Sequence, residues 1–362
     1  MTIFGTRPEA IKMAPLVLEL QKSPEHFESI VTVTAQHREM LDQVLDIFGI
    51  TPDYDLDIMK DRQTLVDITV KALEGLDKVM KEVRPDIVLV HGDTSTTFVA
   101  SLAAFYNQLV VGHVEAGLRT WNKYSPYPEE MNRQLTGVIA DLHFAPTSKA
   151  AKNLLAENKN EESIFITGNT AIDALKTTVK DRYEHDVLKK IGSDRLILLT
   201  AHRRENLGGG IEAILRGVVA ALDGHPDCTA VLASHPNPDV RREVERVRHP
   251  RLLVCDPLAY ADSIWMLKHA AVIVSDSGGI QEEAPSFGTP VLVARDVTER
   301  PEGLQAGFLR LVGSDERRVA SALDEVLADS GLRERLKGTP NPYGDGHAAE
   351  RIAADVAGLL KS

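Results

Sequence analysis

Short runs of apolar residues alternate along the whole chain with stretches of helical periodicity. Residues 30–33 are rich in β-branched side chains, which is typical of a strand. Between Met13 and Leu20, apolar residues recur at positions i, i+3, i+4 and i+7, the spacing of one helix face. We expect Pro15 in the first turn of that helix, where a missing N–H group costs little. The chain therefore opens with the elements of an α/β fold.

The other strand candidates are almost continuously apolar instead of alternating between apolar and polar residues. Such runs are typical of a parallel sheet whose two faces are both covered by helices. Helical segments such as 211–222 separate the runs, which form two series. The pattern therefore predicts two doubly wound, Rossmann-like α/β domains. The first series comprises residues 87–90, 109–114, 142–145 and 163–167, and the second comprises 196–200, 229–233, 251–254, 271–275 and 290–294.

A polar stretch, residues 180–194, separates the two series and is the expected linker. We predict an N-terminal domain over residues 1–179 and a C-terminal domain over residues 180–347. Residues 348–362 have helical apolar spacing over most of their length. We expect this last segment to pack back on the first domain as a helix.

Composition and charge limit the classes of protein to which the chain can belong. Of its 362 residues, 43% are hydrophobic and 26% charged, as in ordinary soluble globular proteins. No apolar run approaches the ~20 residues that cross a bilayer, so we predict no membrane partner. There is no signal-type segment at the N-terminus, and Cys228 and Cys255 are too few for a disulfide framework, which predicts a cytoplasmic protein. The net charge of −12 disfavours a nucleic-acid partner.

Basic residues stand where predicted strands end, although the chain as a whole is acidic. Ligands of open α/β sheets bind outside the carboxyl ends of the strands. Arg7 follows the first strand, residues 202–204 follow a strand of the second series, and Arg300 lies shortly after another. Because arginine can hold an anion bidentately, we expect an anionic ligand in a cleft between the domains. For each residue alone, a capping or solvated role is the alternative.

Carboxylates also collect at strand ends. Asp93 and Glu115 each follow an apolar strand directly, and Glu129 and Glu130 follow a Pro-Tyr-Pro segment. A carboxylate at such a buried position can have a raised pKa and act as an acid or base near neutral pH. A single one is more often hydrogen-bonded to loop amides. Several carboxylates together with a basic pocket favour a catalytic role.

Residues 276–279, Asp-Ser-Gly-Gly, follow a predicted strand and precede a helix-like segment. Two glycines allow the backbone to approach a ligand closely, and a helix N-terminus offers free N–H groups to a phosphate. The alternative is an ordinary strand–helix turn with Asp or Ser as the N-cap.

The sequence lacks the motifs of the common cofactor sites. No G-x-G-x-x-G follows the first strand, and residues 208–210 lack its spacing, which argues against a nicotinamide or flavin dinucleotide. No P-loop and no zinc-type Cys/His spacing is present. Asp55-Leu56-Asp57 matches the short D-x-D of metal-dependent sugar transferases, a pattern common by chance. We therefore predict neither a cofactor nor a metal.

Taken together, the strand-end motifs resemble one family closely, the non-hydrolysing UDP-N-acetylglucosamine (UDP-GlcNAc) 2-epimerases of bacteria. The motifs occur in one order and span nearly the whole chain. They comprise residues 4–15, 34–38, 91–94, 112–119, 167–170, 202–205, 276–279, 283–285, 298–302 and 341–346.

The resemblance implies a glycosyltransferase-B type fold with the active site in the interdomain cleft, and a cytoplasmic homodimer. It also implies reversible conversion of UDP-GlcNAc to UDP-N-acetylmannosamine (UDP-ManNAc), which serves cell-surface polysaccharide synthesis. In the family, UDP is eliminated to give 2-acetamidoglucal and then added back with the proton on the other face. The missing dinucleotide motif independently favours elimination over transient oxidation at C3.

The resemblance also assigns residues by position. The catalytic residues of the family match Asp93, Glu115, Glu129 and His202. Its substrate-binding residues match Arg7, Lys12, His235, Ser277, Gly278, Gly279, Glu283 and Arg300. Gln36, His37 and Arg62 match positions that in some members contact a second UDP-GlcNAc acting as an activator.

Other functions are also consistent with the same residues. A hydrolysing 2-epimerase would release free ManNAc and UDP, and a UDP-sugar glycosyltransferase would share the fold. A non-catalytic UDP-sugar sensor would bind its ligand without turnover.

Overall fold

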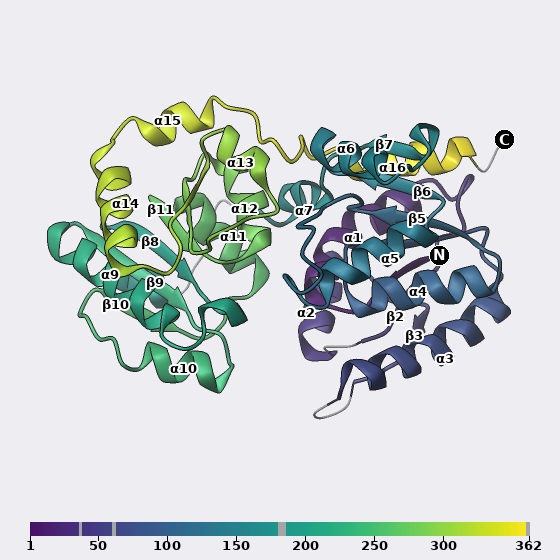
Figure 1. The fold of residues 1–362 in the computed structure, drawn as a ribbon, viewed down its shortest axis with the longest axis horizontal. Helices are drawn as coiled ribbons and strands as arrows, with labels where there is room; N and C mark the ends of the chain where they lie inside the picture. Colours follow the sequence, from purple (N-terminus) through teal and green to yellow (C-terminus); the bar gives the residue numbers. More distant parts are fainter. Residues whose placement is uncertain (36–37, 60–62, 180–185, 360–362) are drawn as a thin grey trace. The chain divides into compact units, whose positions relative to one another are not determined.

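The chain folds into two compact units, and unit 1 is built from two separate pieces of the sequence. Unit 1 comprises Met1–Lys176 together with Tyr343–Ser362, and unit 2 comprises Thr177–Pro342. Each unit contains one parallel sheet with its own helices (Figure 1). The computed structural model describes residues 1–35, 38–59, 63–179 and 186–359.

The strands of unit 1 are β1 (Thr2–Phe4), β2 (Val31–Val33), β3 (Tyr54–Asp55), β4 (Ile87–His91), β5 (Val110–Val114), β6 (Leu142–Ala145) and β7 (Ile164–Ile166). They pair in the order β3-β2-β1-β4-β5-β6-β7, and each neighbouring pair is parallel. The strand order reverses between β1 and β4. In doubly wound sheets, ligands bind beyond the carboxyl ends of the strands at this switch point.

The helices of unit 1 are α1 (Arg7–Gln21), α2 (Arg38–Phe48), α3 (Leu65–Val83), α4 (Ser95–Tyr106), α5 (Glu129–Ile139), α6 (Ser148–Ala156), the 3-10 helix η1 (Glu161–Ser163), α7 (Thr170–Thr178) and α16 (Ala348–Leu359). In one layer α3 packs on α4 and α4 packs on α5, whereas α1 packs on both α2 and α16. The sheet is thereby covered on both faces, as its continuously apolar strands predict.

The strands of unit 2 are β8 (Arg195–Thr200), β9 (Cys228–Ala233), β10 (Leu252–Cys255), β11 (Val272–Ser275), β12 (Val291–Val293) and β13 (Leu309–Leu311). They form a parallel sheet in the order β10-β9-β8-β11-β12-β13. Its switch point lies between β8 and β11. The loops that carry His202 and Asp276 leave these two strands.

The helices of unit 2 are α8 (Asp186–Ile191), the 3-10 helix η2 (Arg204–Asn206), α9 (Gly210–Gly224), α10 (Pro238–Val244), α11 (Tyr260–His269), α12 (Gly278–Glu283), the 3-10 helix η3 (Ala284–Phe287), α13 (Pro301–Gln305), α14 (Glu316–Ala328) and α15 (Leu332–Lys337). Among the described residues, every helix is too short or too polar to span a bilayer.

Helix α1 begins earlier than its apolar spacing suggests. Thr6 is the N-cap, and its hydroxyl and the Glu9 carboxylate form a capping box that starts the helix at Arg7. Pro8 occupies the first turn, so Pro15 lies inside the helix. The prediction that Pro15 belongs to the first turn was wrong, because the apolar periodicity marks the buried face and not the start of the helix.

The expected linker is partly helical. Within it, Asp186–Ile191 forms α8, and Val187 and Ile191, four residues apart, are both buried. An i, i+4 apolar pair in a charged stretch is too weak a pattern to predict a helix. The edge strands β3 and β13 were also missed, since runs of two and three residues give little periodic signal.

The C-terminal helix α16 is fastened to unit 1 by hydrogen bonds as well as by packing. The Asp173 carboxylate of α7 accepts the backbone N–H groups of Ala348 and Ala349, at 3.2 and 2.8 Å. These are the first residues of α16, so an aspartate from another helix supplies its N-terminal cap. Upstream, the N–H of Asn169 donates to the carbonyl of Tyr343 at 2.7 Å.

Candidate functional site

The switch point of unit 1 is organised around a buried glutamate, Glu9. Its Oε2 accepts the N–H groups of Gly5 and Thr6 at 3.1 and 2.8 Å. Its Oε1 accepts the hydroxyls of Thr94 and Thr97, at 2.6 and 3.0 Å, from the start of α4. Burial raises the pKa of Glu9, whereas these hydrogen bonds lower it. The Glu9 carboxylate therefore links the loop after β1 to the loop after β4 by hydrogen bonds.

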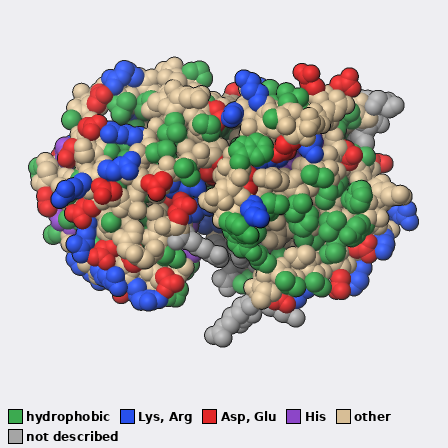
Figure 2. All heavy atoms as spheres, viewed as in Figure 1, with side chains coloured by type: hydrophobic (Ala, Val, Ile, Leu, Met, Phe, Trp, Pro, Cys, Tyr) green, Lys and Arg blue, Asp and Glu red, His purple; other side chains and the backbone are tan. Residues whose placement is uncertain are grey.

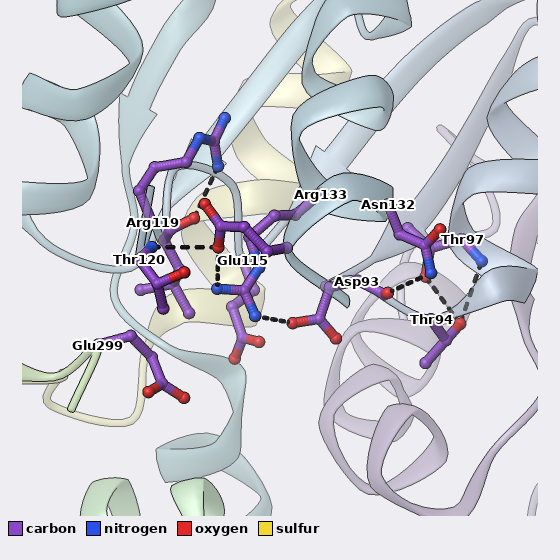
Figure 3. Close-up of polar contacts among 12 residues, drawn as sticks. Asp93, Thr94, Thr97, Glu115, Arg119, Thr120, Asn132, Arg133 and Glu299 are labelled. Atoms are coloured by element: carbon purple, nitrogen blue, oxygen red, sulfur yellow. Dashed lines mark hydrogen bonds and ion pairs between the residues drawn. The ribbon is translucent and has the colours of Figure 1, made fainter. Parts of the chain in front are cut away.

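Asp93 stands in the second of these loops, and α5 holds it at two points. Arg133 forms an ion pair with the Asp93 carboxylate, and the Asn132 side-chain amide donates to the Asp93 carbonyl at 3.0 Å (Figure 3). The other side of the Arg133 guanidinium contacts Glu130 at 3.2 Å. Glu130 is fully buried and also accepts the N–H of Thr120 at 3.1 Å. The contact with Glu130 therefore fixes the guanidinium that pairs with Asp93.

Glu129 is the first residue of α5 and has a different environment from Glu130. Its Oε2 is buried and makes no hydrogen bond within the described part of the chain. Residues three and four apart share a helix face, so Glu129 lies on the same side of α5 as Asn132 and Arg133. This is the side that contacts Asp93. Glu130 therefore forms a hydrogen bond and an ion pair within unit 1, whereas among the described residues the Oε2 atom of Glu129 accepts no hydrogen bond.

Glu115 follows β5, the neighbour of β4, with a left-handed backbone φ of 63°. Its carboxylate forms an ion pair with Lys12 of α1 and accepts the side-chain amide of Asn169 at 2.9 Å. The side chains of Lys12 and Glu115 are only 11% and 7% exposed. At 3.8 Å, the Nε2 atom of His91 also faces this carboxylate. A buried carboxylate held by a cation and an amide is fixed in position.

Three buried histidines lie on the adjacent strands β4, β5 and β6 of the unit 1 sheet. His91 ends β4, and His113 of β5 is in register with His143 of β6. Burial lowers the pKa of His91 to about 4, of His113 to about 3 and of His143 to about 4. All three rings are therefore neutral at neutral pH.

We expect acidification from pH 7 to pH 5 to reduce the unfolding free energy by about 2 kcal/mol for each of these histidines. The folded pKa values lie below the ordinary value of 6.5, so the unfolded chain binds more protons in this range. Stability is present above pH 6.5 and is lost as the pH falls toward 4. Urea unfolding at the two pH values measures the effect. His143→Leu should reduce the difference by about 2 kcal/mol, whereas the matched change at the exposed His26 should not; equal stability at both pH values would contradict the prediction.

The switch point of unit 2 places His202 beside Asp276. The carboxylate of Asp276 accepts the His202 backbone N–H at 2.8 Å, and its Oδ1 lies 3.4 Å from the Nδ1 of the His202 ring. The His202 ring stacks on His235 with centroids 5.3 Å apart and planes 8° apart. Burial is the main cause that lowers the pKa of both histidines.

The turn after β11 packs closely on Arg300. A Cβ atom at Gly278 would lie 2.8 Å from the Arg300 guanidinium, so a larger residue there would displace that guanidinium. Arg300 is itself paired with the carboxylates of Glu282 and Glu299. Its charge is therefore largely balanced within unit 2.

Two further predicted residues lie at the ends of α12. Ser277 is the N-cap residue and makes no side-chain cap bond. Glu283, the last residue, accepts the hydroxyl of the buried Tyr260 at 3.1 Å.

The Asp55-Leu56-Asp57 sequence faces a basic partner. Arg38 forms an ion pair with Asp55 and lies 3.8 Å from a carboxylate oxygen of Asp57. Across the described residues, no group of three or more His, Cys, Asp or Glu side chains is placed to hold a metal ion.

Comparison with known proteins decides the family. A family model described as UDP-N-acetylglucosamine 2-epimerase matches residues 18–357. The chain belongs to this family. The UDP-N-acetylglucosamine 2-epimerase of Bacillus subtilis (strain 168) is 57% identical to it over 358 residues, which cover 98% of this chain and 94% of that protein.

Solved structures of the UDP-N-acetylglucosamine 2-epimerase family have the same fold. The S. aureus MnaA–UDP co-structure matches with a TM-score of 0.94 and 52% identity, covering 100% of this chain and 96% of that one. The UDP-GlcNAc 2-epimerase from Neisseria meningitidis bound to UDP-GlcNAc matches with a TM-score of 0.92 and 46% identity, covering 100% and 99%. These matches confirm the family, the isomerase class and the glycosyltransferase-B type fold that we predicted from the sequence.

Within this epimerase, each unit brings its own predicted residues together. Unit 1 places Asp93 against α5, which Glu129 begins, and pairs Glu115 with Lys12. Unit 2 stacks His202 on His235. It also gathers Ser277, Gly278, Gly279, Glu283 and Arg300 around α12. Arg7 is the first residue of α1, and the predicted activator residues Gln36, His37 and Arg62 lie outside the described residues.

Four residues that hold the predicted site residues in place were not predicted as their partners. Arg133 and Asn169 hold Asp93 and Glu115, Glu130 anchors Arg133, and Asp276 contacts His202. Only the contact of Glu130 with Arg133 joins residues three apart in the sequence, a helical spacing that was an available signal. The other contacts join residues far apart in the sequence, so no spacing could show them.

Proposed function

We propose that the chain interconverts UDP-GlcNAc and UDP-ManNAc by inverting C2 of the sugar, with elimination of UDP as the first step. The family match and the UDP-GlcNAc bound to the Neisseria meningitidis relative support the substrate. The cluster of carboxylates held at the unit 1 switch point supports the chemistry, and is the observation that carries the proposal.

The substrate itself dictates the order of bond changes. The C2 hydrogen has no adjacent carbonyl and is not acidic in the ground state. As the C1–O bond to UDP breaks, positive charge develops at C1 and the C2 proton becomes acidic. A base takes that proton, the C2–H electron pair forms the C1–C2 double bond, and UDP leaves as the anion. The products are 2-acetamidoglucal and UDP. Re-addition delivers a proton to the opposite face of C2 while a UDP oxygen bonds to C1.

Inversion needs proton-transfer groups on both faces of the sugar ring. We assign this work to Asp93, Glu115 and Glu129. Arg133 fixes Asp93, while Lys12 and Asn169 fix Glu115. Fixed acids and bases of this kind typically accelerate a reaction by about 10²- to 10⁴-fold.

The nucleotide must be retained while the C1–O bond is broken. We assign binding of the diphosphate and nucleoside to residues of both units. His202 would donate a hydrogen bond to the leaving diphosphate. Arg7 and Lys12 would serve from unit 1. From unit 2 we assign His235, Ser277, Gly278, Gly279, Glu283 and Arg300. Gln36, His37 and Arg62 stay a prediction for binding an activator.

Turnover of UDP-GlcNAc in D2O tests the proposal. Proton NMR should show UDP-ManNAc with the UDP ester intact and deuterium incorporated at C2. Free ManNAc and UDP would indicate a hydrolysing enzyme instead. Unchanged UDP-GlcNAc without deuterium incorporation would indicate a transferase or a sensor, and would overturn the proposal.

We place the enzyme in the cytoplasm as a homodimer. Cys228 and Cys255 are both free thiols, as expected in a reducing compartment. Exposed apolar side chains on the adjacent helices α3, α4 and α5 form a patch on unit 1, visible over these helices in Figure 2. Patches of this kind mark protein–protein contacts. This apolar patch comprises Val66, Val70, Phe105, Tyr106, Leu135 and Val138.

A charge in the apolar patch is expected to dissociate the dimer. Val138 is 72% exposed in the single chain, so Val138→Glu should leave the fold intact and halve the mass measured by light scattering. A buried unpaired carboxylate costs several kcal/mol at an interface, about 3 kcal/mol or more. Leu155→Glu, the same kind of change on α6, should leave the mass unaltered. A native chain that is already monomeric would refute the dimer.

A further inference from the structure

Asp276 is fully buried at the end of β11, and one of its oxygens is already fully used. Its Oδ2 accepts the backbone N–H groups of His202 and Arg203, both at 2.8 Å, and the side-chain amide of Asn206 at 3.0 Å. Three donors on one oxygen fix the plane of the carboxylate. They also fix the loop after β8 relative to the loop after β11.

The other oxygen has a different environment. In the described residues Oδ1 of Asp276 makes no hydrogen bond, and it lies 3.4 Å from the Nδ1 atom of His202. A buried carboxylate oxygen without a donor is costly, so this oxygen needs a partner. The Nδ1–H group of His202 is within reach, and a small rotation of the ring closes the distance to an ordinary hydrogen bond.

The charged and titratable groups around His202 differ in their effects. Burial lowers the pKa of His202 below its ordinary value and Arg203 lowers it further, whereas Asp276 raises it. His235 is stacked on the His202 ring, and its own pKa is lowered by burial and by His202 and raised by Asp276. Two stacked rings resist carrying a charge together. A carboxylate directed at Nδ1 of His202 therefore selects His202 as the ring that is protonated.

We propose that Asp276 is a positioning residue that accepts a hydrogen bond from Nδ1–H of His202 and thereby presents Nε2–H as a donor to the departing diphosphate. The inference rests on the proposed function of His202 and extends it to a residue that does not touch the substrate. Negative charge develops on the diphosphate oxygen as the C1–O bond breaks. A charged donor already aimed at that oxygen stabilises the transition state more than the ground state. The proton on Nδ1 stays on His202 throughout.

Asp276→Asn tests this assignment with little change in shape. The amide oxygen can still accept the three donors, and the amide NH2 then faces Nδ1. Because an NH2 group donates, Nδ1 must accept, and the protonated ring is disfavoured. We expect the pKa of His202 to fall by about one pH unit. Long-range ¹H–¹⁵N NMR of histidine-labelled protein, assigned with His202→Asn, measures it. The kcat should fall about 10²-fold with little change in KM, and the alkaline limb of kcat should move to lower pH.

Two further variants separate positioning from a merely structural role. In a His202→Asn background, adding Asp276→Asn should change kcat by less than about threefold, since both act through one ring. Asn206→Ala removes a donor from the other oxygen of Asp276 and should leave the pKa of His202 unchanged.

An unchanged His202 pKa in Asp276→Asn overturns the proposal, as does the same loss of kcat in both backgrounds. If the native chain shows no turnover of UDP-GlcNAc, the proposed function fails. The NMR comparison then still decides whether Asp276 controls the protonation of His202.

Discussion

Asp93→Asn is expected to lower kcat about 10³-fold while UDP-GlcNAc still binds. Asparagine has nearly the same shape as aspartate, so the contact of the Asp93 carbonyl with Asn132 persists. Arg133 keeps its contact with Glu130 and stays in place. What is lost is a carboxylate that can take or return the C2 proton. Turnover and deuterium incorporation at C2 should therefore fall together, whereas the Kd measured by calorimetry should change little.

The control for this variant is Asp77→Asn, the same chemical change on α3, where Asp77 contacts Lys81 and Asn107. It should turn over like the native enzyme. Native-like deuterium incorporation in Asp93→Asn would remove Asp93 from the proton-transfer steps. A loss of binding without a loss of kcat would assign it to substrate recognition.

Lys12→Met is expected to lower the unfolding free energy of unit 1 by about 3 kcal/mol and to abolish turnover. Methionine fills similar space but leaves the Glu115 carboxylate, 7% exposed, without its cation. Asn169 still donates to that carboxylate, but a neutral amide does not balance its charge. Each unit contains one tryptophan, Trp121 in unit 1 and Trp265 in unit 2. Urea unfolding followed by Trp121 fluorescence in a Trp265→Phe background reports on unit 1.

A double variant distinguishes the missing charge from a packing defect. Adding Glu115→Gln to Lys12→Met removes the carboxylate that has lost its ion pair with Lys12, and should restore most of the stability without restoring turnover. If the added Glu115→Gln gives no recovery, the loss comes from poorer packing of the methionine side chain and not from the charge. Such an outcome would argue against the ion pair as the main support of Glu115.

The α/β class was predictable because its signal is spread over many residues. Each long strand is mainly apolar, as Ile87–His91 is up to Val90, and is followed by a polar loop, so these elements support the same fold. The short edge strands β3 and β13 lacked such a signal. Helix α8 was missed for the same reason.

The carboxylates of the candidate site could be predicted from the sequence, but most of the residues that contact them could not. Asp93, Glu115 and His202 lie within two residues of the ends of their strands, and in each unit the strand ends meet at one edge of its own parallel sheet. The partners Asn169 and Asp276 lie 54 and 74 positions from the residues that they contact. Only the folded topology brings them close. Arg300 illustrates the opposite case, since its position suggested a free cation and the structure pairs it with Glu282 and Glu299.

The cap that Asp173 provides to α16 has a consequence for the order in which the protein matures. The ribosome synthesises all of unit 2 before the residues that receive this cap. Until then α1 lacks its neighbour α16, and Asp173 of α7 lacks the two backbone N–H groups that it accepts. Unit 1 therefore completes last although most of it is synthesised first. A released chain truncated after Pro342 would contain all of unit 2 but would lack the last part of unit 1.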